Sequence, residues 1–166
     1  DHFNVMHGEK IFDITDSFFR FSYCYIWDDY YRKLFVSLKA DPDQFIIEIP
    51  ESLKFQDIRD SGEKEIDYTY YLGWEEGKRL QEIIEIMRKI KQMGYKVAVR
   101  PHPRYTKMRE LMRIAKDIQI EDFKTLGIEE SILRTRNAIS VFSTVLNQAY
   151  YNGVNIVIDD ISDPQK

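Results

Sequence analysis

The chain has 166 residues, 43% apolar residues, a formal net charge of −4 and one cysteine, Cys24. A chain of this length buries roughly 68–70% of the surface that its unfolded form exposes, so it can form a full hydrophobic core without covalent cross-links. A single cysteine excludes a disulfide framework and a cysteine-based zinc site. The acidic balance disfavours a general nucleic-acid binder, and no apolar run approaches the roughly 20 residues that span a bilayer.

Short apolar, β-branched runs alternate with helical patterns along the chain. This alternation is typical of an α/β fold with a doubly wound, mainly parallel sheet of the Rossmann type. The runs predict strands at Phe3–Met6, Tyr23–Trp27, Phe45–Ile49, Tyr68–Leu72, Lys96–Arg100, Ile118–Ile120, Ala138–Phe142 and Asn155–Ile158.

The clearest helix is predicted from Glu75 to Met93, because its apolar residues recur at 3.6-residue spacing on one face. Gly94 follows it as a helix-terminating glycine should. Weaker patterns predict further helices at Asp28–Ala40, Tyr105–Lys116, Ile128–Arg136 and Thr144–Asn152.

We expect residues 1–166 to form a single nucleotide-binding domain. The segment Gln56–Asp67 contains a charged, Ser-Gly-bearing stretch and predicts either a mobile loop or the seam where another domain attaches. The chain begins at Asp1 rather than at an initiator Met, which leaves open that it is a fragment of a larger protein.

One candidate site follows the predicted strand that ends at Arg100, where the sequence reads Arg100-Pro101-His102-Pro103-Arg104. Ligands of open α/β sheets bind outside the carboxyl ends of the strands. The two prolines fix the backbone around His102, whose imidazole can donate a proton or a hydrogen bond to a phosphate. Arg100 and Arg104 add positive charge for a phosphate or carboxylate. The alternative is a stiff loop with a surface histidine.

A second candidate site lies where Ser143 and Thr144 open a helix after a buried strand. Two hydroxyls and free backbone N–H groups at a helix N-terminus suit an anion, although Ser143 could simply cap the helix. Two further acidic residues, Glu129 and Glu130, open the preceding helix. They either complement its dipole or accept hydrogen bonds from a ribose.

A weaker candidate is the pair His7-Gly8, which follows the first predicted strand and could bring backbone close to a ligand or form an ordinary turn. The sequence contains no GxGxxG, GxxxxGK[ST], GxSxG or HExxH motif. The three histidines lack metal-ligand spacing, so we expect no metal cofactor.

The order of these pieces, with Trp27-Asp-Asp-Tyr-Tyr31 opening a helix, resembles the carboxyl-terminal, nucleotide-binding half of GT-B glycosyltransferases that use CMP- or CDP-linked donors. Bacterial sialyltransferases with an HP motif and a Ser-Ser or Ser-Thr motif are the nearest of these. The resemblance extends over about Met6–Ile158, and its distinctive pieces are His102-Pro103 and Ser143-Thr144.

The resemblance implies a role for each matching residue. His102 would contact the phosphate of a CMP leaving group and assist its departure, and Ser143 and Thr144 would hold the same phosphate. Glu130 or Glu129 would bind the ribose, and the loop near Glu121 would read the cytosine through backbone groups. Enzymes of this kind carry their catalytic carboxylate in a second domain, in an Asp-Asp-Gly or Glu-Asp-Gly pattern that these 166 residues do not contain.

The leading hypothesis is therefore the donor-binding domain of a CMP-sugar-dependent, sialyltransferase-like glycosyltransferase of bacterial surface polysaccharide or lipooligosaccharide synthesis. Its partners would be a nucleotide-sugar donor, a glycan acceptor, and a missing N-terminal domain or a second copy of the chain. A CDP-glycerol or CDP-ribitol phosphotransferase and a non-catalytic nucleotide-binding remnant are the alternatives. We expect a cytoplasmic protein, with attachment at the inner membrane face left open.

Overall fold

A computed structural model describes residues 2–6, 20–55, 64–141 and 143–160. Tertiary contacts divide the chain into two compact units, Asp1–Lys54 and Phe55–Lys166. The expectation of one domain over 1–166 stays a prediction for the chain as a whole. The boundary lies beside the predicted seam, of which residues 56–63 fall outside the described residues.

The first unit contains a three-stranded parallel sheet in the order β1-β2-β3. Its described elements are β1 (Phe3–Val5), β2 (Tyr23–Ile26), α1 (Asp29–Ser37), the 3-10 turn η2 (Pro42–Gln44) and β3 (Phe45–Ile47). The α1 helix begins where expected because the Asp28 carboxylate caps it, accepting from the backbone N–H groups of Tyr30 and Tyr31. Phe35 of α1 is buried and stacks on Phe45 at 5.5 Å between ring centroids.

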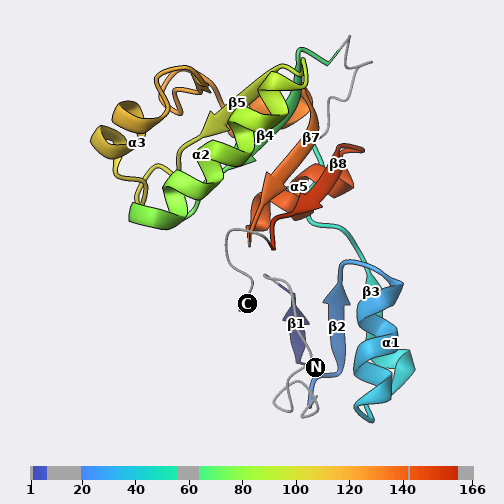
Figure 1. The fold of residues 1–166 in the computed structure, drawn as a ribbon. Helices are drawn as coiled ribbons and strands as arrows, with labels where there is room; N and C mark the ends of the chain where they lie inside the picture. The colour runs from blue at the N-terminus through green and yellow to red at the C-terminus, as the bar shows by residue number, and fades with distance from the viewer. Residues whose placement is uncertain (1, 7–19, 56–63, 142, 161–166) are drawn as a thin grey trace. The chain divides into compact units, whose positions relative to one another are not determined.

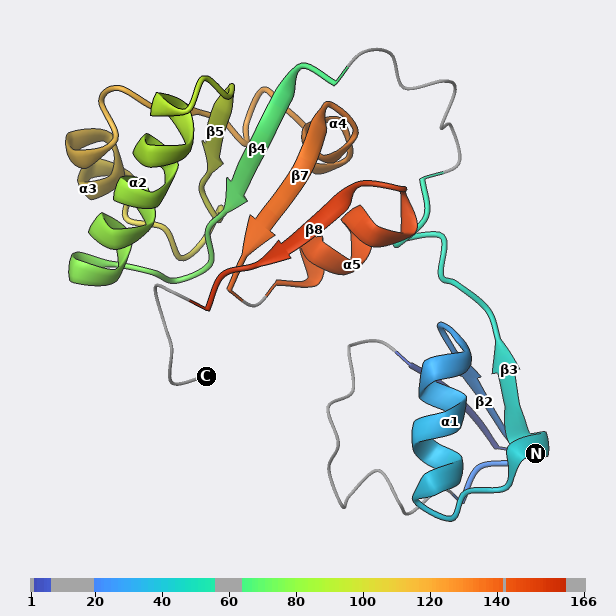
Figure 2. The same ribbon diagram turned by 45° about the vertical axis from the view of Figure 1, so that its right-hand side comes forward.

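The second unit contains a five-stranded sheet in the order β6-β5-β4-β7-β8, and all four strand pairings are parallel. Figure 1 and Figure 2 show β5, β4, β7 and β8 side by side, with α2 and α5 beside the sheet. In chain order the elements are β4 (Ile66–Tyr71), α2 (Gly77–Gln92), β5 (Val97–Arg100), α3 (Met108–Ile114), β6 (Gln119–Ile120), α4 (Ile128–Leu133), β7 (Thr135–Ser140), α5 (Thr144–Tyr151) and β8 (Asn155–Ile158).

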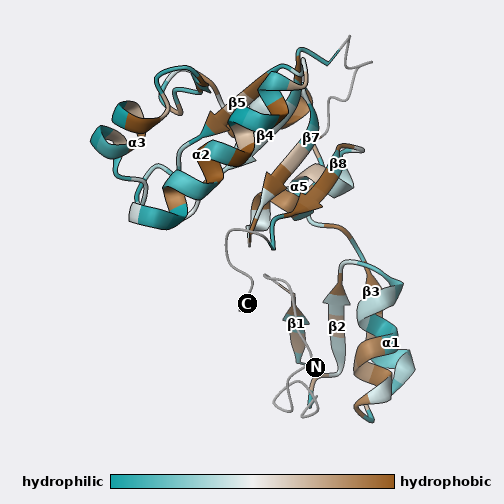
Figure 3. Cartoon of the chain, in the orientation of Figure 1, coloured by the Kyte–Doolittle hydropathy of each residue, from teal (hydrophilic) through white to brown (hydrophobic). Residues whose placement is uncertain are grey.

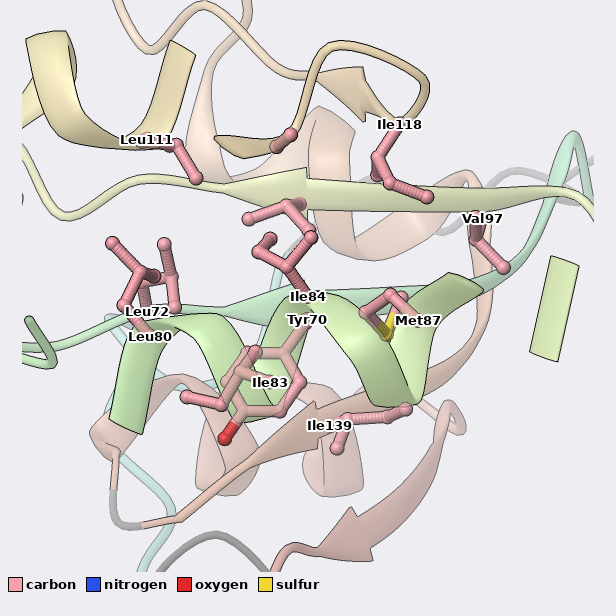
Figure 4. Close-up of a cluster of buried hydrophobic side chains, with 12 residues drawn as sticks. Tyr70, Leu72, Leu80, Ile83, Ile84, Met87, Val97, Leu111, Ile118 and Ile139 are labelled. Carbon is pink, nitrogen blue, oxygen red and sulfur yellow. The ribbon is translucent and has the colours of Figure 1, made fainter. Parts of the chain in front are cut away.

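The two faces of this sheet are covered by different helices, as a doubly wound fold requires. On one face, α2 and α3 pack against β4 and β5 in a cluster that contains Tyr70, Val97 and Leu111 (Figure 4). On the other face, α4 and α5 pack against β4 and β7 in a cluster that contains Tyr71 and Ala138. The predicted fold class is therefore confirmed.

The long helix α2 follows the predicted periodicity. Its fully buried side chains form one stripe, and each contributes about 1.5–3 kcal/mol of hydrophobic stabilisation. Figure 3 shows hydrophobic and hydrophilic residues alternating along it, as expected for an amphipathic helix. Gly94 follows with a φ of +96°, a left-handed conformation that glycine adopts without strain. The stripe consists of Leu80, Ile83, Ile84 and Met87.

The main correction concerns the segment around Thr135. The sequence predicted a helix through Arg136, whereas α4 ends at Leu133 and β7 already begins at Thr135. Thr135 pairs with Ile66, and its buried hydroxyl lies 2.6 Å from that of Thr69 on the neighbouring strand. This core pairing lengthens both strands at the expense of the helix.

The predicted helix Tyr105–Lys116 is also shorter than expected, since α3 spans Met108–Ile114. The predicted strand Ala138–Phe142 ends at Ser140, and Phe142 lies outside the described residues. Across the described residues, we find no helix that is both long enough and apolar enough to cross a membrane.

Candidate functional site

The order of the five-stranded sheet reverses direction at β4. The chain moves from β4 through β5 to β6 on one side, and then returns to add β7 and β8 on the other side. Ligands of open α/β folds bind at such a switch point, outside the carboxyl ends of the strands. The strands β4, β5 and β7 end at one level. Tyr71 of β4 pairs with Arg100 of β5, and the Tyr71 carbonyl accepts a 2.9 Å hydrogen bond from the Ser140 hydroxyl of β7.

The loop after β5 fixes the orientation and tautomer of His102. The Nδ1 atom of its half-buried imidazole accepts hydrogen bonds from the backbone N–H groups of Arg104 (3.1 Å) and Tyr105 (3.3 Å). An Nδ1 that accepts cannot carry the proton of a neutral imidazole, so the proton lies on Nε2. The Tyr105 ring stacks on the imidazole at 4.5 Å. His102 therefore presents one oriented donor, Nε2–H.

Thr106 ties this histidine loop to the loop after the central strand β4. Its hydroxyl oxygen accepts from the backbone N–H of His102 at 2.8 Å and lies 3.4 Å from the carbonyl of Gly73. Sequence reasoning missed Thr106, although a hydroxyl residue soon after a Pro-His-Pro turn is a signal that a side chain braces the turn.

The loop after β4 was also missed as part of the site, and it reads Gly73-Trp74-Glu75-Glu76-Gly77. The Glu75 carboxylate, in a residue only 5% exposed, accepts from the backbone N–H of Gly73 at 2.6 Å. Trp74 is 56% exposed, and the Arg79 guanidinium lies over its ring at 5.1 Å. Two glycines that flank a Trp-Glu-Glu sequence just after a predicted strand were the available signal.

The loop after β7 leads directly into α5. Ser143 caps this helix, since its hydroxyl accepts from the backbone N–H of Val145 at 3.2 Å, and the exposed Thr144 is the first helical residue. The capping alternative is therefore confirmed, and phosphate binding by Ser143 and Thr144 stays a prediction. β4 separates β5 from β7, so the histidine loop and α5 start about two strand spacings apart, roughly 10 Å.

Beneath these loops, Arg100 and Glu121 form a buried ion pair. Arg100 Nη1 lies 3.3 Å from Glu121 Oε2, and Nη2 donates to the Leu126 carbonyl at 2.9 Å. The Ser131 hydroxyl donates to the same carboxylate oxygen at 2.5 Å. Arg100 thus directs its charge into the interior, which corrects the expectation that it faces a bound anion. Arg100 pairs with Glu121 because an unpaired charge is costly in apolar surroundings, and the Glu121 carboxylate is the nearest opposite charge.

The network continues to Tyr71, whose hydroxyl lies 3.1 Å from that of Ser131. Burial raises the pKa of Tyr71 to about 12. Glu121 was expected to read a base through backbone groups. Its side chain belongs to this network and its N–H donates to the Val99 carbonyl at 2.9 Å, so any reading of a base would use its carbonyl or its neighbours.

The remaining candidates lie on the surface or outside the described residues. Glu129 and Glu130 are exposed in the first turn of α4, at the carboxyl edge, where ribose binding stays a prediction. Pro103 and Arg104 are exposed beside His102. The pair His7-Gly8 lies outside the described residues. Within the described ranges, no group of three His, Cys, Asp or Glu side chains is arranged to hold a metal ion.

Comparisons with known proteins extend the description of the fold. No protein-family model matches the chain, and no curated protein matches it. A candidate UDP-N-acetylglucosamine 2-epimerase from Listeria monocytogenes has a TM-score of 0.59 and 12% identity over 82% of this chain and 41% of that chain. A UDP-N-acetylglucosamine 2-epimerase from Rickettsia bellii has a TM-score of 0.51 and 15% identity over 93% of this chain and 48% of its own.

The chain therefore spans less than half the length of these two solved structures. At this level of identity the likeness concerns the fold. The neighbours have a GT-B-like fold. This chain has the same α/β, Rossmann-like arrangement, in which helices flank parallel sheets.

Proposed function

We propose that the unit Phe55–Lys166 binds the phosphate groups of a pyrimidine nucleotide sugar at the carboxyl edge of its sheet, as the nucleotide-binding part of a nucleotide-sugar-processing enzyme. The observation that carries this proposal is the oriented Nε2–H donor of His102, at the end of a strand next to the switch point. A donor fixed before the ligand arrives loses little entropy on binding, which favours affinity.

The phosphate would lie between two kinds of donor. His102 Nε2–H would donate to one phosphoryl oxygen, and the N-terminus of α5 with Ser143 and Thr144 would supply further donors and a positive dipole end. Because these two positions are roughly 10 Å apart, the nucleotide would lie across β4, over the Gly73 loop. The exposed Trp74 ring, which has the Arg79 guanidinium over one face, would stack on a base or a sugar with its other face.

In a transfer reaction, the bond between the sugar carbon and the phosphate oxygen breaks, and the nucleotide leaves with both electrons of that bond. The negative charge then grows on the phosphate that His102 contacts, so its hydrogen bond strengthens as the reaction proceeds. The acceptor oxygen would form the new bond to that sugar carbon, while its hydroxyl proton passes to a carboxylate from another domain. Acceptor, linkage and catalytic base therefore belong to the whole enzyme.

Two nucleotides are supported by different observations. The His-Pro and Ser-Thr pieces favour a CMP-sugar donor of the sialyltransferase type, as the sequence resemblance implies. The solved neighbours are described as UDP-N-acetylglucosamine 2-epimerases, which favours a uridine diphosphate sugar. A phosphate next to a pyrimidine nucleoside is common to both.

Isothermal titration of the full chain with CMP and with UDP tests the proposal. We expect saturable binding of at least one nucleotide below millimolar concentration, and weaker binding by His102→Ala. His2→Ala is the matched control, because His2 is exposed and belongs to the other unit. Absence of binding by the folded chain, or equal affinity of His102→Ala and wild type, would reject this assignment.

Thermal shifts then rank complete donors. CMP-sialic acid, CDP-glycerol and UDP-N-acetylglucosamine would each raise the melting temperature according to its affinity. The donor with the largest shift at equal concentration identifies the nucleotide and sugar class, and separates the transferase, phosphotransferase and epimerase alternatives.

A further inference from the structure

A hollow lies at the amino edge of the five-stranded sheet, opposite the edge described above. It has a volume of about 650 Å³, and its wall includes Ile66, Val97 and Gln119, the first residues of β4, β5 and β6. The switch-point loops leave the other ends of these strands, so the hollow is separate from the nucleotide site proposed above.

The wall of the hollow is strongly basic. It contains four cationic side chains, Lys64, Lys91, Lys96 and Arg134, from four different parts of the fold. Among the described wall residues, Glu65 is the only acidic one. This concentration of positive charge contrasts with the net charge of −4 of the whole chain.

The positive charge is only partly neutralised inside the protein. Arg134 is shared between two carboxylates, with Nη2 at 3.4 Å from Glu65 and Nε at 4.0 Å from Glu121. Lys64 donates to the carbonyl of Leu133 at 2.6 Å, and Lys91 donates to the carbonyl of Asp117. The Leu133 carbonyl orients Lys64 but carries no full negative charge to cancel it, whereas Lys91 is also attracted by the Asp117 carboxylate.

Lys96 adds a further positive charge to the wall of the hollow. Its backbone N–H donates to the Asp67 carboxylate at 2.8 Å, and that carboxylate lies 3.7 Å from Arg136, so Asp67 already has a cationic partner. Burial lowers the pKa of Lys64, which indicates that this cation is partly withdrawn from water. Coulombic attraction is stronger where water is partly excluded, so an anion beside Lys64 would gain more than one beside a fully exposed lysine.

One wall of the hollow is aromatic. Tyr95 is 42% exposed, and its ring packs edge-on against Tyr68 at 5.3 Å between centroids. An oriented tyrosine beside several cations is an arrangement that suits a ligand with both a flat or apolar part and several negative charges.

We infer that this hollow, the basic amino-edge site, binds a small molecule that carries two or more phosphate charges, with Lys64, Lys96 and Arg134 contacting the phosphates. The occupant is distinct from the nucleotide at the switch point, and the inference does not depend on His102.

The test is an amide NMR titration of the full, isotope-labelled chain with inorganic pyrophosphate. Binding should shift the amides of Lys64, Lys96 and Val97 together. Lys96→Gln should weaken binding about tenfold, which corresponds to the loss of one charged contact, and Lys64→Gln should do the same. Lys89→Gln on the outer side of α2, outside this hollow, is the control and should bind like wild type.

Titration with ADP identifies the source of the phosphate. Tighter binding of ADP than of pyrophosphate, lost in Tyr95→Leu, would assign a nucleotide, and equal binding would assign a phosphorylated molecule without a base. The site is refuted if pyrophosphate shifts no amides around the hollow, or if Lys89→Gln weakens binding as much as Lys96→Gln. His102→Ala should leave this binding unchanged, which separates failure here from failure of the nucleotide site.

Discussion

Arg100 and His102 are two residues apart at the end of β5, yet their side chains do different work. Arg100 is 6% exposed and its guanidinium is bound to Glu121 in the interior. His102 is half-buried, and backbone donors orient it with one N–H left for a ligand. We propose that, at the carboxyl edge of this sheet, the buried layer contributes stability and the loop layer above it binds the nucleotide. The following predictions separate these two layers.

The largest effect is expected from breaking the buried ion pair. Arg100→Leu leaves the Glu121 carboxylate buried without its closest cation, which should lower the free energy of unfolding by about 3–5 kcal/mol in urea denaturation. The double variant Arg100→Leu/Glu121→Leu should recover most of this loss. A loss below about 1 kcal/mol in the single variant would place Arg100 outside the stabilising layer.

The second effect is a pH dependence of stability from Tyr71. Burial raises its pKa from 10 to about 12 in the folded protein, so the unfolded chain loses this proton first as the pH rises. The contribution of Tyr71 is fully present below pH 10, and it falls by about 3 kcal/mol between pH 10 and 12.

Denaturation of wild type and Tyr71→Phe across that range measures this contribution. The phenylalanine variant should show a flatter decline, and Tyr30→Phe, at a 62% exposed position, should follow wild type. Parallel curves for wild type and Tyr71→Phe would show that Tyr71 does not titrate differently in the folded state.

The third effect falls on binding rather than on stability. His102→Ala should lower nucleotide affinity by about 1.5–3 kcal/mol, because it removes one hydrogen bond to a charged group. Turnover of the complete enzyme should fall further, by about 10²–10⁴-fold, if the imidazole also assists the leaving group. The free energy of unfolding should fall by only about 1–2 kcal/mol, less than in Arg100→Leu, because the variant loses the partly exposed hydrogen bonds to Arg104 and Tyr105. Calorimetry and denaturation of the same sample check both layers at once.

The smallest effect is expected from Thr106, which positions His102 without contacting the ligand. Thr106→Val keeps the shape but removes the hydroxyl that joins the histidine loop to Gly73, so we expect about 1 kcal/mol of lost stability. Affinity should fall less than in His102→Ala, and Thr106→Ser should restore it. Full affinity in a destabilised Thr106→Val would limit this residue to a structural role.

The sequence predicted most of the elements, because apolar periodicity and capping act locally. The α2 stripe and Gly94 were both readable from the residues nearby. The start of β7 could not be predicted from nearby residues, since Thr135 enters the strand by pairing with Ile66, about seventy residues earlier in the chain. Local pattern cannot weigh such a contact against helix propensity.

For the candidate site, the sequence located His102 and Ser143 at strand ends but misplaced the role of Arg100. Alternating residues of a strand point to opposite sides, and only the fold shows which partner each side meets. The bracing hydroxyl of Thr106 and the loop around Trp74 join the site through the order β6-β5-β4-β7-β8, which no local pattern contains.

The most direct test of the central claim is the nitrogen spectrum of the His102 side chain during a nucleotide titration. The chain has three histidines, so His2→Ala and His7→Ala variants complete the assignment. Before nucleotide is added, we predict that Nε2 carries a proton and that Nδ1 is a hydrogen-bond acceptor. Saturation with CMP or UDP should then shift the Nε2 resonance while Nδ1 remains an acceptor. A proton on Nδ1, or an Nε2 resonance that does not move while nucleotide binds, would contradict the account.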